Sequence, residues 1–218
     1  MHACGHDGHV AIGLGMAELM AQMRDEFDGT LKLIFQPAEE GVRGAKSMVD
    51  AGVVDDVDYL LGQHLFTGWA LGEMTPGMGG YLATHKFDVL FEGRSAHSGG
   101  CPEEGRNALL AAASAVLGLH SISRHSEGAT RINVGRMIAG EGRNVIPATA
   151  NLAVETRGSS SKLAQYMLSR AVDVLKAAAD MHGCQVEIKS MGSADSADSD
   201  PDLAARVEQV TARLGGIR

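Results

Sequence analysis

The first nine residues hold a high concentration of side chains that bind metals. Three histidines, one cysteine and one aspartate occupy residues 2–9. Cys4 and His6 are two positions apart, so both can face one cation, and zinc or manganese accepts such donors. His2 and His9 could orient His6 without binding the metal themselves. By themselves, a buried cysteine and an ordinary loop histidine are the simpler interpretation of Cys4 and His6.

Two later stretches add carboxylates and another imidazole. Glu39 and Glu40 are adjacent and follow a proline, and His64 follows an apolar run at residues 58–62. Neighbouring carboxylates can have different functions in catalysis: one can bind a metal while the other accepts a proton from water. Alone, a solvated acidic loop and a core histidine are simpler explanations. The coincidence of three such stretches favours a metal site.

The first 65 residues are expected to place these side chains at one edge of a sheet. The expected elements are helices at residues 9–27 and 43–51 and strands at residues 30–35 and 58–62. Apolar residues at steps of three and four predict the first helix, with Asp7 as its N-cap. Alternating helices and strands are typical of a mostly parallel sheet, whose ligands gather at the carboxyl ends of the strands.

The pattern changes after the glycine-rich residues 68–80, which we interpret as a domain boundary. The elements expected beyond it are strands at residues 84–91, 131–138, 150–157 and 185–190 and helices at residues 107–122 and 161–181. The order β-α-β-β-α-β predicts an antiparallel, ferredoxin-like sheet with two helices on one face. The predicted fold class is α/β: part of a mostly parallel-sheet catalytic domain with an inserted α+β domain.

Composition excludes several classes of function. The net charge of −8 and an aromatic content of 4% argue against a nucleic-acid surface. No apolar run approaches the length of a membrane span, and no secretory signal is recognisable. Three widely spaced cysteines form no disulfide framework, so a reducing, cytoplasmic setting is expected.

Glycine-rich loops in the second half present three further polar candidates. His97 lies in the loop at residues 93–100, which can offer an imidazole to something outside its own domain. Asn144 lies in a similar loop, and Arg157 ends a strand nearby. Arginine commonly binds carboxylates, although an exposed loop histidine and a surface salt bridge are the alternative interpretations.

Together these motifs resemble the co-catalytic metallopeptidase family of aminoacylases, carboxypeptidases and auxin-conjugate amidohydrolases. The resemblance is carried by the sequences at residues 1–9, 33–41, 62–64, 93–99, 102–109, 143–147 and 154–158. It implies that Cys4, His6, Glu40 and His64 bind two divalent ions, zinc or manganese. It also implies that Glu39 is the general base in hydrolysis of the amide bond of small N-acyl or N-aroyl amino acids.

The resemblance extends to the inserted domain, which it implies is a lid and dimerisation domain pairing with its own copy or with a sister subunit. His97 would reach into the partner's site and stabilise the oxyanion. Asn144 and Arg157 would hold the carboxylate of the substrate. Residues 1–80 are then the first part of the catalytic domain, residues 81–190 the lid and residues 191–218 the return to the catalytic domain.

The family pattern includes a strand before the first motif and a late histidine ligand, and no histidine follows His182 here. We therefore expect an internal part of a longer protein, with four of five ligands. The alternative hypotheses are a catalytically incomplete fragment that acts as a dimerisation or interaction module, and a structural zinc protein.

Overall fold

The computed structural model describes residues 2–68, 70–77 and 79–214, which fall into two compact units. Unit 1 comprises the described residues within 1–75 and 208–218, and unit 2 those within 76–207. The assignment of residues 1–80, 81–190 and 191–218 to catalytic, lid and return segments stays a prediction.

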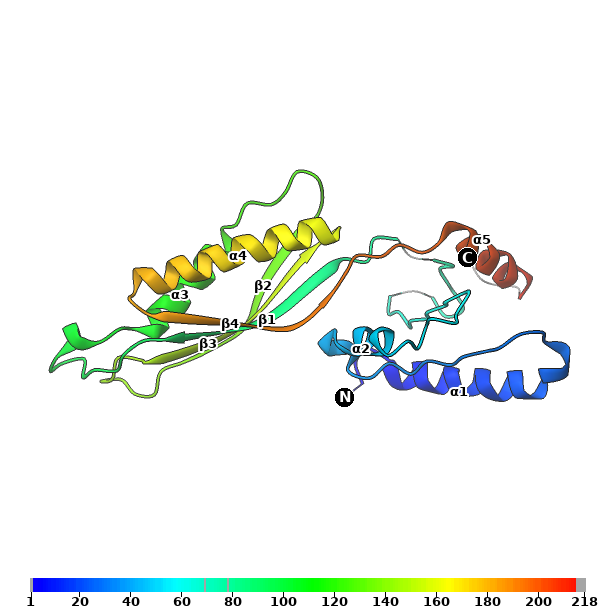
Figure 1. Ribbon diagram of the computed structural model, residues 1–218, viewed down its shortest axis with the longest axis horizontal. Helices are drawn as coiled ribbons and strands as arrows, with labels where there is room; N and C mark the ends of the chain where they lie inside the picture. The colour runs from blue at the N-terminus through cyan, green and yellow to red at the C-terminus, as the bar shows by residue number, and fades with distance from the viewer. Residues whose placement is uncertain (1, 69, 78, 215–218) are drawn as a thin grey trace. The chain divides into compact units, whose positions relative to one another are not determined.

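Unit 2 is a four-stranded antiparallel sheet with two helices on one face (Figure 1). Its elements are β1 (Ala83–Glu92), α3 (Ala108–His120), β2 (Thr130–Ala139), β3 (Thr149–Gly158), α4 (Ser161–Met181) and β4 (Gln185–Ala194). The strand order is β2-β3-β1-β4. The predicted α/β class with a β-α-β-β-α-β unit is confirmed, and β2 and β4 are the two edge strands.

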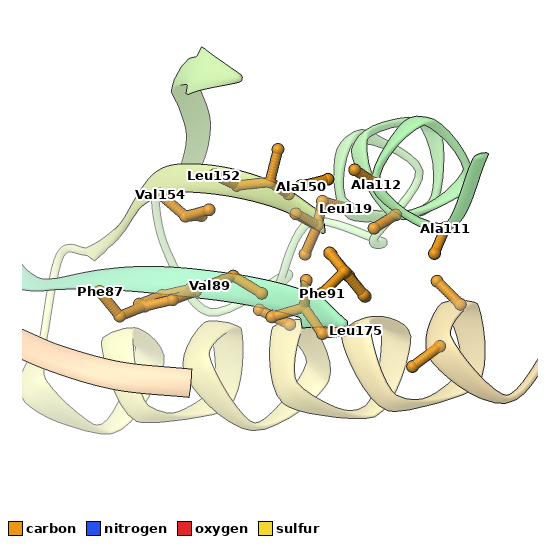
Figure 2. Close-up of a cluster of buried hydrophobic side chains, with 14 of the residues drawn as sticks. Phe87, Val89, Phe91, Ala111, Ala112, Leu119, Ala150, Leu152, Val154 and Leu175 are labelled. Carbon is orange, nitrogen blue, oxygen red and sulfur yellow. The ribbon is translucent and has the colours of Figure 1, made fainter. Parts of the chain in front are cut away.

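The core of unit 2 lies between this sheet and its two helices. Phe87, Val89 and Phe91 alternate along β1 and point toward α3 and α4 (Figure 2). The helix α3 meets the sheet through small side chains at helical spacing, namely Ala108, Ala111, Ala112 and Ala115, all fully buried. Small side chains let the helix approach the strands closely, and large ones on the strands fill the space between.

The segments by which the chain enters and leaves unit 2 are paired with each other. The Tyr81 backbone N–H donates to the Ala197 carbonyl oxygen at 3.1 Å. One residue before, the Gly80 N–H donates to the Asp198 carboxylate at 2.6 Å. The two ends of the unit therefore lie side by side.

Unit 1 contains helices and irregular segments. Its elements are α1 (His6–Gln22), α2 (Gly44–Asp50) and the 3-10 helices Arg24–Glu26 and Glu39–Gly41, and α5 (Pro201–Arg213) spans the boundary between the two units. The two predicted helices are present. Among the described residues, no helix is both long and apolar enough to cross a membrane.

The two strands predicted for unit 1 are not formed. Residues 30–35 and 58–62 pair with no other segment among the described residues, so the predicted parallel sheet is absent from that part of the chain. A strand is stable only when a neighbour satisfies its backbone groups. Here Tyr59, Leu60 and Leu61 are each more than 60% exposed, so the apolar pattern that suggested a buried strand lacks a covering layer.

Candidate metal centre

Cys4 and His6 lie where the chain enters α1. The helix begins at His6, and its N-cap is Gly5, whose φ of 76° is in the left-handed region that glycine adopts without strain. The prediction that Asp7 caps the helix is therefore wrong, because Asp7 already lies within the first turn. The left-handed turn at Gly5 separates the two donor residues and presents both at the same end of the helix.

The Glu39–Glu40 pair lies in a short turn with a strained backbone. The 3-10 helix Glu39–Gly41 is flanked by Ala38, with a φ of 49°, and Val42, with a φ of 54°. Left-handed backbone at such residues costs about 1–3 kcal/mol and persists where surrounding structure imposes it, often at ligand sites. It is rarest for a β-branched residue such as Val42. The backbone therefore supports a functional role for this turn.

The helix α2 packs against the backbone that leads into this acidic turn. A Cβ atom at Gly44 would lie 1.5 Å from the Pro37 carbonyl oxygen. No rotation of a side chain can relieve a clash with a backbone atom, so this approach requires glycine. Gly44 thereby lets α2 support the segment that carries Glu39 and Glu40.

His64 is oriented by its own neighbour. Its Nδ1 donates a hydrogen bond to the Leu65 carbonyl oxygen at 2.6 Å, which leaves the lone pair on Nε2. That Nε2 lies 3.4 Å from Cys4 Sγ. A sulfur and a nitrogen bound to one tetrahedral zinc, at about 2.3 and 2.0 Å, are roughly 3.5 Å apart. The pair is therefore spaced as two ligands of one ion.

The donors form two overlapping sets. One set is Cys4, His6 and His64, the other is His6, Glu39 and Glu40, and within each set the ligand atoms all lie within 4.8 Å of one another. Thiolate, imidazole and carboxylate together suit zinc and other divalent transition ions. The residues present thus fit the expected metals, and the predicted ligands and the predicted base all converge in unit 1.

Three imidazoles gather around this centre. The ring centroids of His9 and His64 are 4.5 Å apart, and those of His6 and His9 are 5.2 Å apart. Burial lowers the pKa of His9, and the nearby His64 and His6 lower it further, outweighing the opposite effect of Asp7 and Glu39. The neutral form of His9 is therefore favoured, and a neutral imidazole can accept a hydrogen bond.

In unit 2, His97 and Asn144 lie together. Their loops form an isolated β-bridge, in which the Ser98 N–H donates to the Asn144 carbonyl oxygen at 2.9 Å. The Gly99 N–H donates to His97 Nδ1 at 3.2 Å, so the ring proton is on Nε2. The Asn144 side-chain amide lies 3.5 Å from that Nε2, and with the proton there the amide oxygen rather than the NH₂ group must face the ring. The two loops thus hold the His97 imidazole and the Asn144 amide side by side.

Arg157 lies away from this pair. It is the penultimate residue of β3, whereas Asn144 precedes the first residue of that strand, Thr149. Eight residues of strand span about 26 Å. Arg157 Nη2 instead donates to Glu155 Oε1 at 3.0 Å. Within unit 2, the structure does not bring together the two residues predicted to hold one carboxylate.

Comparison with known proteins gives this centre a context. Residues 1–218 match the peptidase family M20/M25/M40. The chain belongs to this family. Two curated relatives are each 53% identical over 217 residues: a subunit of the p-aminobenzoyl-glutamate hydrolase of Escherichia coli (strain K12) and indole-3-acetyl-aspartic acid hydrolase of Enterobacter agglomerans. Each alignment covers the whole chain and 50% of the relative, so the chain spans about half the length of these relatives.

Solved structures agree with these matches. An aminobenzoyl-glutamate utilization protein from Klebsiella pneumoniae is 51% identical with a TM-score of 0.88, covering 97% of this chain and 54% of its own. A Bacillus subtilis protein described as a dinuclear metal binding peptidase from the M20 family is 28% identical with a TM-score of 0.71, covering 100% and 56%. The sequences at residues 34–45 and 48–59 resemble p-aminobenzoyl-glutamate hydrolase, and the first of the curated relatives confirms that resemblance.

Proposed function

We propose that the full-length protein hydrolyses the amide bond of N-acyl or N-aroyl amino acids with two divalent ions, zinc or manganese. The observation that carries this proposal is the convergence of two donor sets, sharing His6, from three separate segments of unit 1. Membership of the M20/M25/M40 family supports the reaction class. A solved relative described as binding two metals supports the number of ions.

The proposed roles follow from the chemistry of each side chain. Cys4, His6, Glu40 and His64 would hold the ions, which lower the pKa of a water molecule and polarise the scissile carbonyl when bound. Glu39 accepts the proton of the attacking water and delivers it to the leaving amine. Its Oε2 lies 3.7 Å from His6 Nε2, and it belongs with Glu40 to the second donor set. Glu39 is also exposed.

Glu39→Gln in the full-length protein tests the assignment of the base. Glutamine keeps the shape of the side chain but cannot accept the proton, so turnover should fall by about 10²–10⁴-fold. Metal content, measured by mass spectrometry of the metals, should stay near that of the native protein. Glu26→Gln, an exposed acid elsewhere in unit 1, is the matched control and should change neither quantity. Unreduced turnover of Glu39→Gln would remove Glu39 from this role.

We further propose that the leaving amino acid is acidic. The two relatives at 53% identity differ in the acyl group that their names contain, but both names contain an acidic amino acid. A hydrolysis panel with p-aminobenzoyl and indole-3-acetyl groups on glutamate, aspartate and leucine separates the two halves of the substrate. Higher kcat/KM for the glutamate and aspartate conjugates is expected, and equal values for leucine conjugates would contradict the proposal.

We propose that unit 2 is the lid and dimerisation domain, pairing with its own copy or with a sister subunit. The first relative is named as one subunit of an enzyme, which supports an assembly. The edge strand β2 carries the exposed apolar residues Met137 and Ile138, and α3, which packs over this side of the sheet, exposes Leu110 and Leu117. Unpaired strand edges beside exposed apolar side chains are typical of subunit contacts.

His97 would donate its Nε2–H to the oxyanion in the partner's site, a type of contact worth about 10²–10³-fold in rate.

A further inference from the structure

His9 belongs to neither donor set, yet it forms hydrogen bonds with the residues on both sides of His64. Its Nε2 accepts a hydrogen bond from the Leu65 backbone N–H at 2.9 Å. Its backbone carbonyl oxygen accepts one from Gln63 Nε2 at 3.4 Å. Both neighbours of His64 are thus bonded to one residue of α1, more than fifty positions earlier in the chain.

Packing against α1 reinforces these two hydrogen bonds. The Leu65 side chain lies over the first turn of the helix, where a Cβ atom at Gly8 would be 2.8 Å from Leu65 Cδ1. The rings of His9 and His64 meet edge to face. Residues 63–65 have no regular secondary structure of their own, so these contacts with α1 help to fix their place.

We propose that His9 is a positioning residue that holds residues 63–65 on α1 and thereby sets the place of His64 Nε2 in the donor set. The proposal rests on the metal centre proposed above, in which His64 is a ligand. The spacing of the histidines in the sequence suggests that His9 orients His6, three residues away on the same helix face. The hydrogen bonds assign it to the His64 segment instead. Supporting contacts of this kind typically change metal affinity by about 10–100-fold.

The test compares two substitutions that differ in one property. His9→Leu removes the acceptor, whereas His9→Gln keeps one, because its Oε1 can take the place of Nε2; both residues favour helix. Calorimetric titration of the metal-free full-length protein with Co²⁺ should give a Kd raised about 10–100-fold for His9→Leu. His9→Gln should restore most of the affinity. His120→Gln, an exposed histidine at the end of α3 in unit 2, should leave it unchanged.

Hydrogen exchange of the Leu65 amide in the metal-free protein is the second readout. Exchange should be faster in His9→Leu than in the native protein and near native in His9→Gln, because only the first leaves this N–H without its acceptor. If His9→Leu does not fold, His9→Asn replaces it, since its shorter amide does not reach Leu65.

The outcomes separate the proposal from the metal centre itself. Unchanged Co²⁺ affinity in the acceptor-free variant, or equal loss in His9→Gln, overturns the positioning role, even if Leu65 exchange responds. Unchanged Co²⁺ affinity in His64→Ala overturns the metal centre, and the Leu65 exchange result then stands by itself. Weaker Co²⁺ binding together with faster Leu65 exchange in His9→Leu, and recovery of both in His9→Gln, supports the role of His9.

Discussion

Thr156 lies in the core of unit 2 with a hydroxyl group that has no hydrogen-bond partner among the described residues. It is fully buried on β3, on the same face as Leu152 and Val154. A buried hydroxyl that has lost its water and gained no partner costs about 1–3 kcal/mol. The residue therefore reduces the stability of the unit in which it lies.

Thr156→Val should raise the free energy of unfolding of unit 2 by about 1 kcal/mol, because it replaces the hydroxyl by a methyl group of similar size. Chemical denaturation followed by a probe within unit 2 measures the change. Thr156→Ala is the control and should destabilise, since it also removes the buried methyl group. A loss of stability in Thr156→Val would show that the hydroxyl is satisfied in solution.

At the scale of single residues, the sequence points out the candidate metal donors but not their contacts. Cys4, His6, Glu39 and His64 are visible in the sequence because their types and local spacing are unusual. The contact of His9 with the His64 segment leaves no such signal, because its partner is a backbone N–H far along the chain. The prediction of Asp7 as the N-cap was wrong because the helix begins at His6, directly after the left-handed Gly5.

Among the elements, the edge strand β2 is where the proposed assembly can be tested. Ile138 is 57% exposed on this strand, so Ile138→Glu should place a charge in the proposed subunit contact without disturbing the core. Light scattering of the full-length protein should show a dimer that dissociates in this variant. Met181→Glu, at an exposed end of α4, should leave the mass unchanged. A native monomer, or a variant that stays dimeric, would contradict the use of this edge.

The elements also show why prediction succeeded in unit 2 and failed in part of unit 1. In unit 2 each strand has its partners within the same stretch of chain, and Asn107 and Ser160 cap the two helices through the Leu110 and Leu163 N–H groups. Local pattern and final structure then agree. Residues 30–35 and 58–62 carry the same apolar signal, but a strand depends on a neighbour that local sequence does not specify.

For the whole molecule, the two units differ in what can stabilise them. Unit 2 has a continuous apolar core. In unit 1, Gly44 and Thr211 are the only buried positions among the described residues. A bound ion stabilises the folded state of the unit that holds it by mass action.

Removal of metal should therefore act on one unit more than the other. Treatment of the full-length protein with EDTA should increase amide hydrogen exchange in residues 2–68, and most near Cys4 and His64. Residues 83–194 should be little affected, because their core binds no ion in the proposed mechanism. Zinc should restore protection when it is added back. An equal response of both units, or none, would contradict a metal centre confined to unit 1.

The pairing of Tyr81 with Ala197 has a consequence for engineering of the protein by domain exchange. Neighbouring strands are about 4.8 Å apart, so a module whose first and last segments pair leaves almost no gap when it is removed. A short glycine bridge can close the host chain, and the excised module can be circularised by an equally short one. Exchange of this module between distant homologues then needs two junctions that lie next to each other, so unit 2 is well suited to exchange by recombination.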